Sequence, residues 1–236
     1  MNAINLHAKP SVDYDKKVAA TQSLLRQAGE QYPPLTQASS LGVEDMVITH
    51  LLHSLGVNSE VFVLQTGKLH AQTLDLLGQV QKLYGSQRTI RIYEPDAKAT
   101  EDFETANGKD AMYKSIALRK QCCDIRKMKP LAQALEGKRA WITGLRKEQS
   151  DDRAAVHAID NSGEKIKINP LHDWLLGDVW HYVKANNVSY NPLHDQFYPS
   201  IGCEPCTRAV TLGEDFRSGR WWWENEAGKE CGLHVS

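Results

Sequence analysis

The segment LTQASSLGVEDM, residues 35–46, contains the start of a recognisable folding unit. Residues 35–40 are predicted to form a short strand, and small residues mark its end at Ser39, Ser40 and Gly42. A helix is predicted directly after this turn, because apolar side chains then recur at helical spacing on one face. That face carries Met46, Val47, His50, Leu51 and Leu55. A strand that turns at once into a helix is typical of a β-α-β unit.

The same alternation continues along the chain. EVFVLQTG, residues 60–67, is a nearly continuous apolar strand of the kind buried on both faces of a parallel sheet. A helical pattern follows over 69–85, and two further strands are predicted at 89–95 and 139–145. Helices are also expected over 14–29 and 172–187. The sequence therefore predicts an α/β fold with a mostly parallel, twisted sheet flanked by helices, whose ligands bind at the carboxyl ends of the strands.

Length and composition bound the organisation. With 236 residues, 41% of them hydrophobic, the chain is expected to form one domain over 1–216 and a flexible, Trp-rich tail over 217–236. The N-terminus lacks a signal-peptide pattern, and no apolar run has the length of a membrane span. We therefore expect a cytoplasmic protein without membrane contact. A net charge of −1 argues against nucleic-acid binding, which needs a surplus of Lys and Arg.

The five cysteines form two close pairs and one remainder. Cys122 and Cys123 are adjacent, Cys203 and Cys206 form a CxxC motif, and Cys231 stands alone five residues from the end. An odd count means that at least one thiol is not in an internal disulfide. In a reducing compartment the pairs are more readily explained as metal ligands or reactive thiols than as disulfides.

Three explanations of the two pairs stay open from the residues alone: a 4Fe-4S cluster, a zinc ion, or unligated buried thiols. Adjacent cysteines reach a single tetrahedral ion poorly, whereas a cluster offers each thiolate its own iron. The segment 119–129 also carries five basic residues and one acid, and these cations would offset the negative charge of a thiolate-bound cluster. The pattern therefore favours the cluster.

Several segments carry groups suited to anions. The turn at residues 39–45 presents backbone N–H groups at a helix start, where phosphates bind, although an ordinary strand-to-helix turn has the same appearance. QTGK, residues 65–68, is a similar turn on the same edge. Arg146 follows a strand end, and Arg217 and Arg220 share one face if their segment is helical. Each arginine also fits a solvated surface charge.

Taken together, these motifs resemble the assimilatory sulfonucleotide reductases, and specifically the cluster-containing, thioredoxin-dependent adenylylsulfate (APS) reductases of the APS/PAPS reductase family. The resemblance rests on SSLGVED, LQTGKLH, CCDIRKMKPL, TGLRKEQS, GCEPCTRAV, RSGRWWW and KECGLH, in that order. Gln65 and Lys68 stand where the resemblance leads us to expect Asp and Arg. The resemblance implies a sheet similar to that of adenine-nucleotide hydrolases, with a modified pyrophosphate loop.

The resemblance also implies roles for individual residues. One 4Fe-4S cluster would be held by Cys122, Cys123, Cys203 and Cys206, and Cys231 would be the nucleophile. The nucleotide and its phosphosulfate would be bound by Ser39, Ser40, Gly42, Asp45, Thr66, Gly67, Lys127, Arg146, Arg217, Arg220 and His234. The substrate would be adenosine 5′-phosphosulfate, reduced to sulfite and AMP in cysteine biosynthesis. Thioredoxin or glutaredoxin would be the reductant, and a homo-oligomer is compatible with this interpretation.

The proposed chemistry gives Cys231 two partners. Its thiolate would attack the substrate sulfur and expel AMP, and an external thiol would then release sulfite from the S-sulfocysteine. Gly228 and Gly232 would let the tail move between the two. The alternatives are reduction of PAPS or of both nucleotides, an ATP-dependent pyrophosphatase acting on tRNA, and a zinc-stabilised binding protein.

Overall fold

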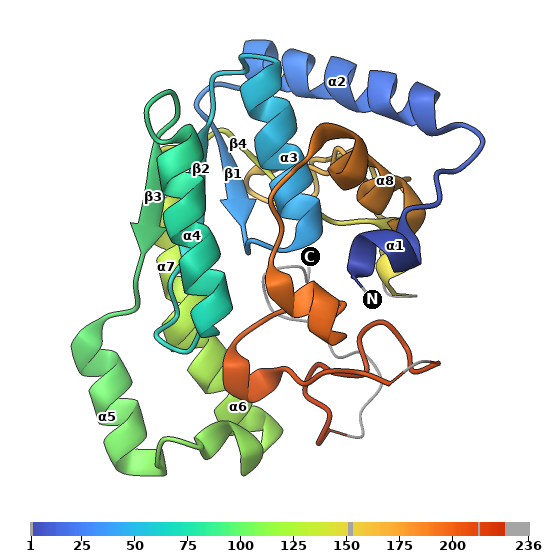
Figure 1. Cartoon of the computed structure of the whole chain (residues 1–236). Coiled ribbons are helices and arrows are strands. Elements are labelled where there is room, and N and C mark those ends of the chain that lie inside the picture. Colours follow the sequence, from blue (N-terminus) through green and yellow to red (C-terminus); the bar gives the residue numbers. More distant parts are fainter. Residues whose placement is uncertain (1, 151–152, 212, 225–236) are drawn as a thin grey trace.

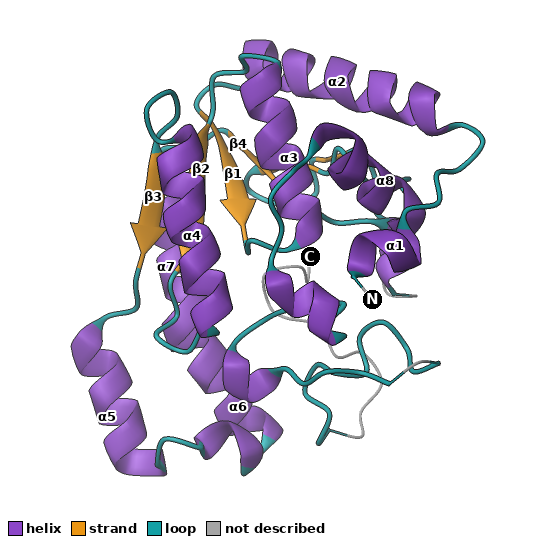
Figure 2. Cartoon of the chain, viewed as in Figure 1, coloured by secondary structure: helices purple, strands orange, loops and turns teal. Residues whose placement is uncertain are grey.

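The structure, a computed structural model, describes residues 2–150, 153–211 and 213–224. Helices alternate with strands over residues 14–93, as the sequence predicts (Figure 1; Figure 2). The strands are β1 Leu35–Ser39, β2 Glu60–Leu64, β3 Ile90–Tyr93, β4 Ala140–Ile142, β5 Ile159–Asp160 and β6 Ile166–Ile168. The α-helices are α1 Ala3–His7, α2 Tyr14–Gln31, α3 Val43–Ser54, α4 Ala71–Tyr84, α5 Ala97–Asn107, α6 Ile116–Cys123, α7 Lys129–Leu135 and α8 Leu176–Asn186.

The sheet order is β3-β2-β1-β4-β6-β5, and only the short β5 is antiparallel to its neighbour. The chain moves outward from β1 to β2 and β3, and then returns to place β4 on the other side of β1. The carboxyl ends of β1 and β4 therefore form the point at which the strand order reverses. In open α/β sheets ligands bind at this point.

The alternation of side chains along β2 builds a core on each face of the sheet. Val63 belongs to a cluster with side chains of α2, α3, α4 and α8. Phe62 instead packs with Trp141 of β4 and with Leu131 of α7. Figure 1 accordingly shows α3 and α4 on one face and α7 behind β2 and β3. A strand buried on both faces explains why residues 60–64 are almost continuously apolar.

Between β3 and β4 the chain leaves the sheet and builds a helical extension, in which α5 and α6 lie below the sheet in Figure 1. After Cys123 the helix widens into a π-helical turn, Asp124–Met128, before α7 continues. Such turns occur frequently at functional sites. This one contains Arg126 and Lys127, which follow the cysteine pair closely in the sequence.

The described part of the predicted tail, residues 217–224, packs onto the domain. Trp221 is 1% exposed and contacts Met112, Cys203 and Cys206. Glu224 accepts two hydrogen bonds from Arg119, at 2.7 and 2.9 Å, and both side chains are buried. Residues of the segment 217–224 are therefore in contact with the domain, and the flexibility expected of 217–236 stays a prediction. The remainder of the predicted tail, 225–236, lies outside the described residues.

Within the described ranges, no helix has both the length and the apolar character needed to cross a bilayer.

Candidate active site

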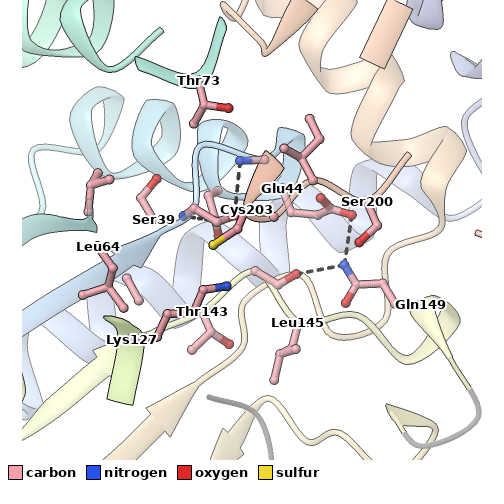
Figure 3. Close-up of a pocket in the computed structure, with 18 of the residues that line it drawn as sticks. Ser39, Glu44, Leu64, Thr73, Lys127, Thr143, Leu145, Gln149, Ser200 and Cys203 are labelled. Carbon is pink, nitrogen blue, oxygen red and sulfur yellow. Dashed lines mark hydrogen bonds between the residues drawn. The ribbon is translucent and has the colours of Figure 1, made fainter. Parts of the chain in front are cut away.

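A cavity of about 190 Å³ opens at the carboxyl ends of β1, β2 and β4 (Figure 3). Ser39 and Ser40 reach it from the end of β1, Thr66 from the turn after β2, and Thr143 and Gly144 from the end of β4. This is the edge at which the strand order reverses, so the cavity occupies the expected ligand position of the fold.

The turn between β1 and α3 is held by its own side chains. The Asp45 carboxylate accepts hydrogen bonds from the Ser40 backbone N–H at 2.6 Å and from the Ser40 hydroxyl at 2.7 Å. The Ser39 hydroxyl accepts from the Leu41 N–H at 3.2 Å, and Leu41 adopts a left-handed conformation with φ 62°. Gly42 caps α3 and lines the cavity. The N-terminus of α3 thus lies at the cavity edge, where the helix dipole favours an anion.

Two buried carboxylates at the start of α3 differ in their electrostatics. Burial raises the pKa of Asp45 to about 6, against the opposing effect of its hydrogen bonds from Ser40. Burial acts most strongly on Glu44 and would raise its pKa, but the charge of Arg146, together with His194 and hydrogen bonds from the Glu44 backbone and Gln149, lowers the pKa overall. Glu44 therefore stays ionised near neutral pH.

Arg146, which the resemblance assigns to substrate binding, is not among the residues that line the cavity. Its side chain is 1% exposed, and its guanidinium contacts Glu44 at 3.0 Å and Glu148 at 2.7 Å. It also donates to the Trp174 carbonyl at 3.2 Å. Because both neighbouring acids and a carbonyl engage this cation, Arg146 compensates buried charge beside the cavity instead of lining it.

Four other cations line the cavity: Lys127, Arg153, Arg217 and Arg220. The guanidinium of Arg220 lies against Gly202, where any added Cβ would come within 2.4 Å of its Nη2 atom. Arg220 also stacks on the Trp221 ring, with its Cζ 4.8 Å from the ring centroid. These contacts fix the direction of one arginine, so the cavity carries a positioned positive charge suited to sulfate or phosphate oxygens.

A second, smaller cavity adjoins the first, and all four paired cysteines line it. Cys122 and Cys123 reach it from the end of α6, and Cys203 and Cys206 from the CxxC turn. Cys203 lines both cavities, as do Lys127 and Arg220. The Cys203 sulfur also lies 3.3 Å from the Thr66 hydroxyl. The two cysteine pairs, 80 positions apart in sequence, therefore meet beside the larger cavity, as the sequence predicts.

The chemistry of this sulfur-lined cavity suits a bound metal centre. Burial raises the pKa of Cys206 to about 11, with the neighbouring Cys203 adding to the effect, and burial also raises the pKa of Cys122. The thiolate forms that ligate a metal therefore need stabilisation by positive charge. Four thiolates at one place need compensation by cations, and Lys68, Arg119, Arg126, Lys127 and Arg220 all line the cavity. Within the described part of the chain, no three Cys, His, Asp or Glu side chains are arranged to hold a single ion.

The other predicted substrate residues divide into three groups. Eight of them line the larger cavity: Ser39, Ser40, Gly42, Asp45, Thr66, Lys127, Arg217 and Arg220. Gly67 and Arg146 are not among the lining residues, and Gly67 instead forms the turn after β2 with φ 73°. Cys231 and His234 lie outside the described residues.

Gln65 and Lys68, where the resemblance leads us to expect Asp and Arg, have defined partners in this turn. Gln65 accepts a hydrogen bond from the Gly67 N–H at 2.9 Å, as a shorter carboxylate would at such a turn. Lys68 forms an ion pair with Glu104 at 3.2 Å and lines the sulfur cavity. The two departures therefore preserve a closed turn and a cation near the cysteines.

Sequence reasoning missed a polar wall of the larger cavity. Glu44, Gln149, Arg153 and His194 line it, and Gln149 links Glu44 to the Gly144 carbonyl at 3.0 and 3.4 Å (Figure 3). Burial lowers the pKa of His194 to about 4, so its ring is neutral near pH 7. Glu44 lies inside the SSLGVED motif and Arg153 just beyond TGLRKEQS, which was the available signal. His194 follows no pattern that indicates a site.

Comparison with known proteins agrees with this arrangement. The phosphoadenosine phosphosulfate reductase domain family matches residues 34–209. A protein of Burkholderia cepacia named adenosine 5'-phosphosulfate reductase is 48% identical over 93% of this chain and 88% of its own length. A protein of the same name from Allochromatium vinosum is 46% identical over 96% of this chain and 90% of its own.

Solved structures show the same architecture. The phosphoadenylyl-sulfate reductase of Candida auris, solved as a phosphate complex, has a TM-score of 0.68 and 30% identity, covering 81% of this chain and 92% of its own. Yeast FAD synthetase, at 11% identity and a TM-score of 0.59 over 88% of this chain and 73% of its own, shares the fold alone. With the switch-point cavity, the converging cysteines and a family match over most of the sequence, this chain belongs to the phosphoadenosine phosphosulfate reductase domain family.

Proposed function

We propose that this protein reduces adenosine 5′-phosphosulfate to sulfite and AMP in sulfate assimilation, with thioredoxin or a related dithiol protein as the reductant, in the cytoplasm. The observation that carries the proposal is the contact between the two cavities. Cys203, Lys127 and Arg220 belong to both, so a nucleotide at the switch point would lie beside the paired cysteines. Relatives named adenosine 5'-phosphosulfate reductase, at 46–48% identity, support the choice of substrate.

In this proposal different residues of the cavity bind the nucleotide end and the sulfate end of the substrate. The turn at Ser39–Ser40 and the start of α3 bind the nucleotide at the sheet edge, as in other folds of this type. The sulfate end lies toward Lys127, Arg217 and Arg220. These cations lower the repulsion between an incoming thiolate and the sulfate oxygens, and they stabilise the negative charge that develops on the AMP oxygen.

The nucleophile in the proposal is the thiolate of Cys231. It attacks the substrate sulfur, forms an S–S bond and breaks the bond between sulfur and the phosphate oxygen, so that AMP leaves with the electron pair. A thiolate of the reductant then attacks the Cys231 sulfur, and sulfite departs with two electrons. The second thiol of the reductant resolves the mixed disulfide, which restores Cys231 and leaves the reductant as a disulfide.

We further propose that Cys122, Cys123, Cys203 and Cys206 hold one 4Fe-4S cluster. Four soft donors, an adjacent pair that suits separate irons, and a ring of cations support this assignment. When bound, the cluster would supply a rigid electrostatic centre that ties α6 to the CxxC turn. Lys127 and Arg220 stand between that centre and the substrate cavity.

The test is a steady-state assay with purified protein and reduced thioredoxin. We expect APS to give sulfite and AMP in equal amounts, with a higher kcat/KM than the 3′-phosphorylated nucleotide PAPS. The alternative within the family, a PAPS-specific or dual reductase, predicts the reverse order or equal values. Release of AMP without sulfite when excess thioredoxin is present would contradict the proposed reduction.

A further inference from the structure

Three aromatic side chains, Tyr113, Trp222 and Trp223, form a surface cluster that the proposed chemistry does not use; we call it the aromatic patch. The ring centroids of Tyr113 and Trp223 are 4.5 Å apart, and those of Trp222 and Trp223 are 4.8 Å apart. Tyr113 is 42% exposed and Trp222 is 38% exposed. None of the three lines either cavity.

The aromatic patch is held firmly from below. The Tyr113 hydroxyl donates to the Pro205 carbonyl, inside the CxxC turn, at 2.5 Å. Trp223 packs against the cluster of Met112, Trp221 and the CxxC cysteines. The buried Glu224–Arg119 pair fixes the chain directly after Trp223. Fixed Trp and Tyr rings offer a large contact area at low conformational cost, and these residue types dominate protein interfaces.

The position of the patch in the chain indicates what covers it. Cys231 lies seven residues beyond Glu224, and an extended chain of that length spans at most about 25 Å. Any protein that exchanges thiols with Cys231 must bring its own reactive cysteine within this radius of Glu224. The aromatic patch adjoins Glu224, so it lies within this radius and is an exposed aromatic surface that such a protein can contact.

We infer that the aromatic patch is the docking surface for the dithiol reductant, a thioredoxin-type protein with an apolar face around its reactive cysteine. This inference rests on the proposed function, because the reductant acts on the S-sulfocysteine formed there. Docking places the partner beside Cys231 without contact to the nucleotide cavity. The surface thus serves the second half of the reaction only.

The test separates the two halves with Trp222→Ala, with Trp222→Phe as the conservative variant and Leu83→Ala as a control. Leu83 is a 55% exposed apolar side chain on α4, a different element from the CxxC turn and from residues 221–224. Each variant is loaded with APS alone, and AMP release measures adduct formation. The adduct is then discharged either by reduced thioredoxin or by dithiothreitol, and sulfite is followed in time.

We expect Trp222→Ala to lower the second-order rate of discharge by thioredoxin about tenfold or more, the scale for a central interface tryptophan. AMP release and discharge by dithiothreitol should stay at wild-type rates. Trp222→Phe should recover most of the loss, and Leu83→Ala should show none.

Unchanged discharge by thioredoxin would overturn the inference. Slower AMP release in Trp222→Ala would overturn it in favour of the tail, residues 225–236, as the occupant of the patch. A lower molar mass of Trp222→Ala than of the wild type, measured by light scattering, would overturn it in favour of a second copy of this chain as the occupant. If the wild type formed no adduct with APS, the proposed function would fail instead, so the two failures are distinguishable.

Discussion

Arg217 and Arg220 are the side chains on which the proposed anion contact depends most directly, since both line the larger cavity. Each change to Ala should cost about 1.5 to 3 kcal/mol of transition-state stabilisation, the scale of a charge-assisted hydrogen bond, or about 10- to 160-fold in kcat/KM. Arg91→Ala is the matched control, because the side chain of Arg91, on β3, is 58% exposed and pairs with Glu60 of β2, and neither residue lines the cavity. Wild-type kcat/KM in both cavity variants would refute the assignment.

Arg146 should behave differently from these two arginines. Its removal leaves Glu44 buried without its cation, and loss of one partner of a buried pair typically costs about 3 to 5 kcal/mol. We therefore expect Arg146→Ala to lower the free energy of unfolding by that amount in urea titrations. A variant as stable as the wild type but inactive would restore Arg146 to the substrate contacts.

Asp45 and His194 give the stability two opposing pH dependences. The pKa of Asp45 is raised from 3.8 to about 6, so the folded state binds this proton more tightly, and the stabilisation it gives at low pH is lost as pH rises through about 6. The pKa of His194 is lowered from 6.5 to about 4, so its stabilisation is present above 6.5 and is lost as pH falls through about 4. Each shift corresponds to about 3 kcal/mol.

Removing one of the two groups should leave the pH dependence of the other group visible in the free energy of unfolding. Between pH 4 and 6, the free energy of unfolding of Asp45→Asn should rise with pH more steeply than that of the wild type, and that of His194→Gln should fall relative to it. Denaturant titrations at several pH values measure both slopes. Parallel curves for all three proteins would contradict the two pKa shifts.

At the scale of elements, the end of α6 and the CxxC turn place their cysteines around one cavity, and a bound metal centre would link the two segments. We expect anaerobically purified protein to contain about four iron and four sulfide per chain, the content of one cubane cluster. Cys123→Ser should lose the cluster and most activity, because Cys123 lies at the end of α6 beside the other three thiols. Zinc without labile sulfide would contradict the cluster.

The strands and the turns after them were predictable because they have local signals. Residues 60–64 are a short, nearly continuous apolar run, residues 35–39 lead directly into a small-residue turn and a helical pattern, and both segments are strands in the parallel sheet. β5 and β6, of two and three residues, are too short to produce a periodic pattern. The π-helical turn after Cys123 also has no sequence signature, although it places Arg126 and Lys127.

Contacts between distant segments explain why the surroundings of some site residues could not be predicted from the sequence. Arg146 follows a strand end, where a substrate residue is expected, but its orientation depends on Glu44, 102 positions earlier. Trp221 looks like part of a polar tail, yet it fills space beside Met112 and the CxxC turn. The local sequence around Arg146 and Trp221 does not indicate that Glu44 and Met112 are their partners. The convergence of the cysteines was predictable because their chemistry, and not their local environment, indicated a common centre.

At the scale of the whole molecule, the proposed function requires a nucleotide in the cavity at the sheet edge, the sulfur-lined cavity beside it, and Cys231 as the nucleophile. The most direct measurement is mass spectrometry of the protein after incubation with APS in the absence of thioredoxin. We predict one sulfonate adduct per chain, on the peptide that contains Cys231, which reduced thioredoxin discharges as sulfite. Cys231→Ser should keep the cluster and bind nucleotide but form no adduct, since a neutral hydroxyl lacks the nucleophilicity of a thiolate. An adduct on another residue, or turnover by Cys231→Ser near the wild-type rate, would contradict the account.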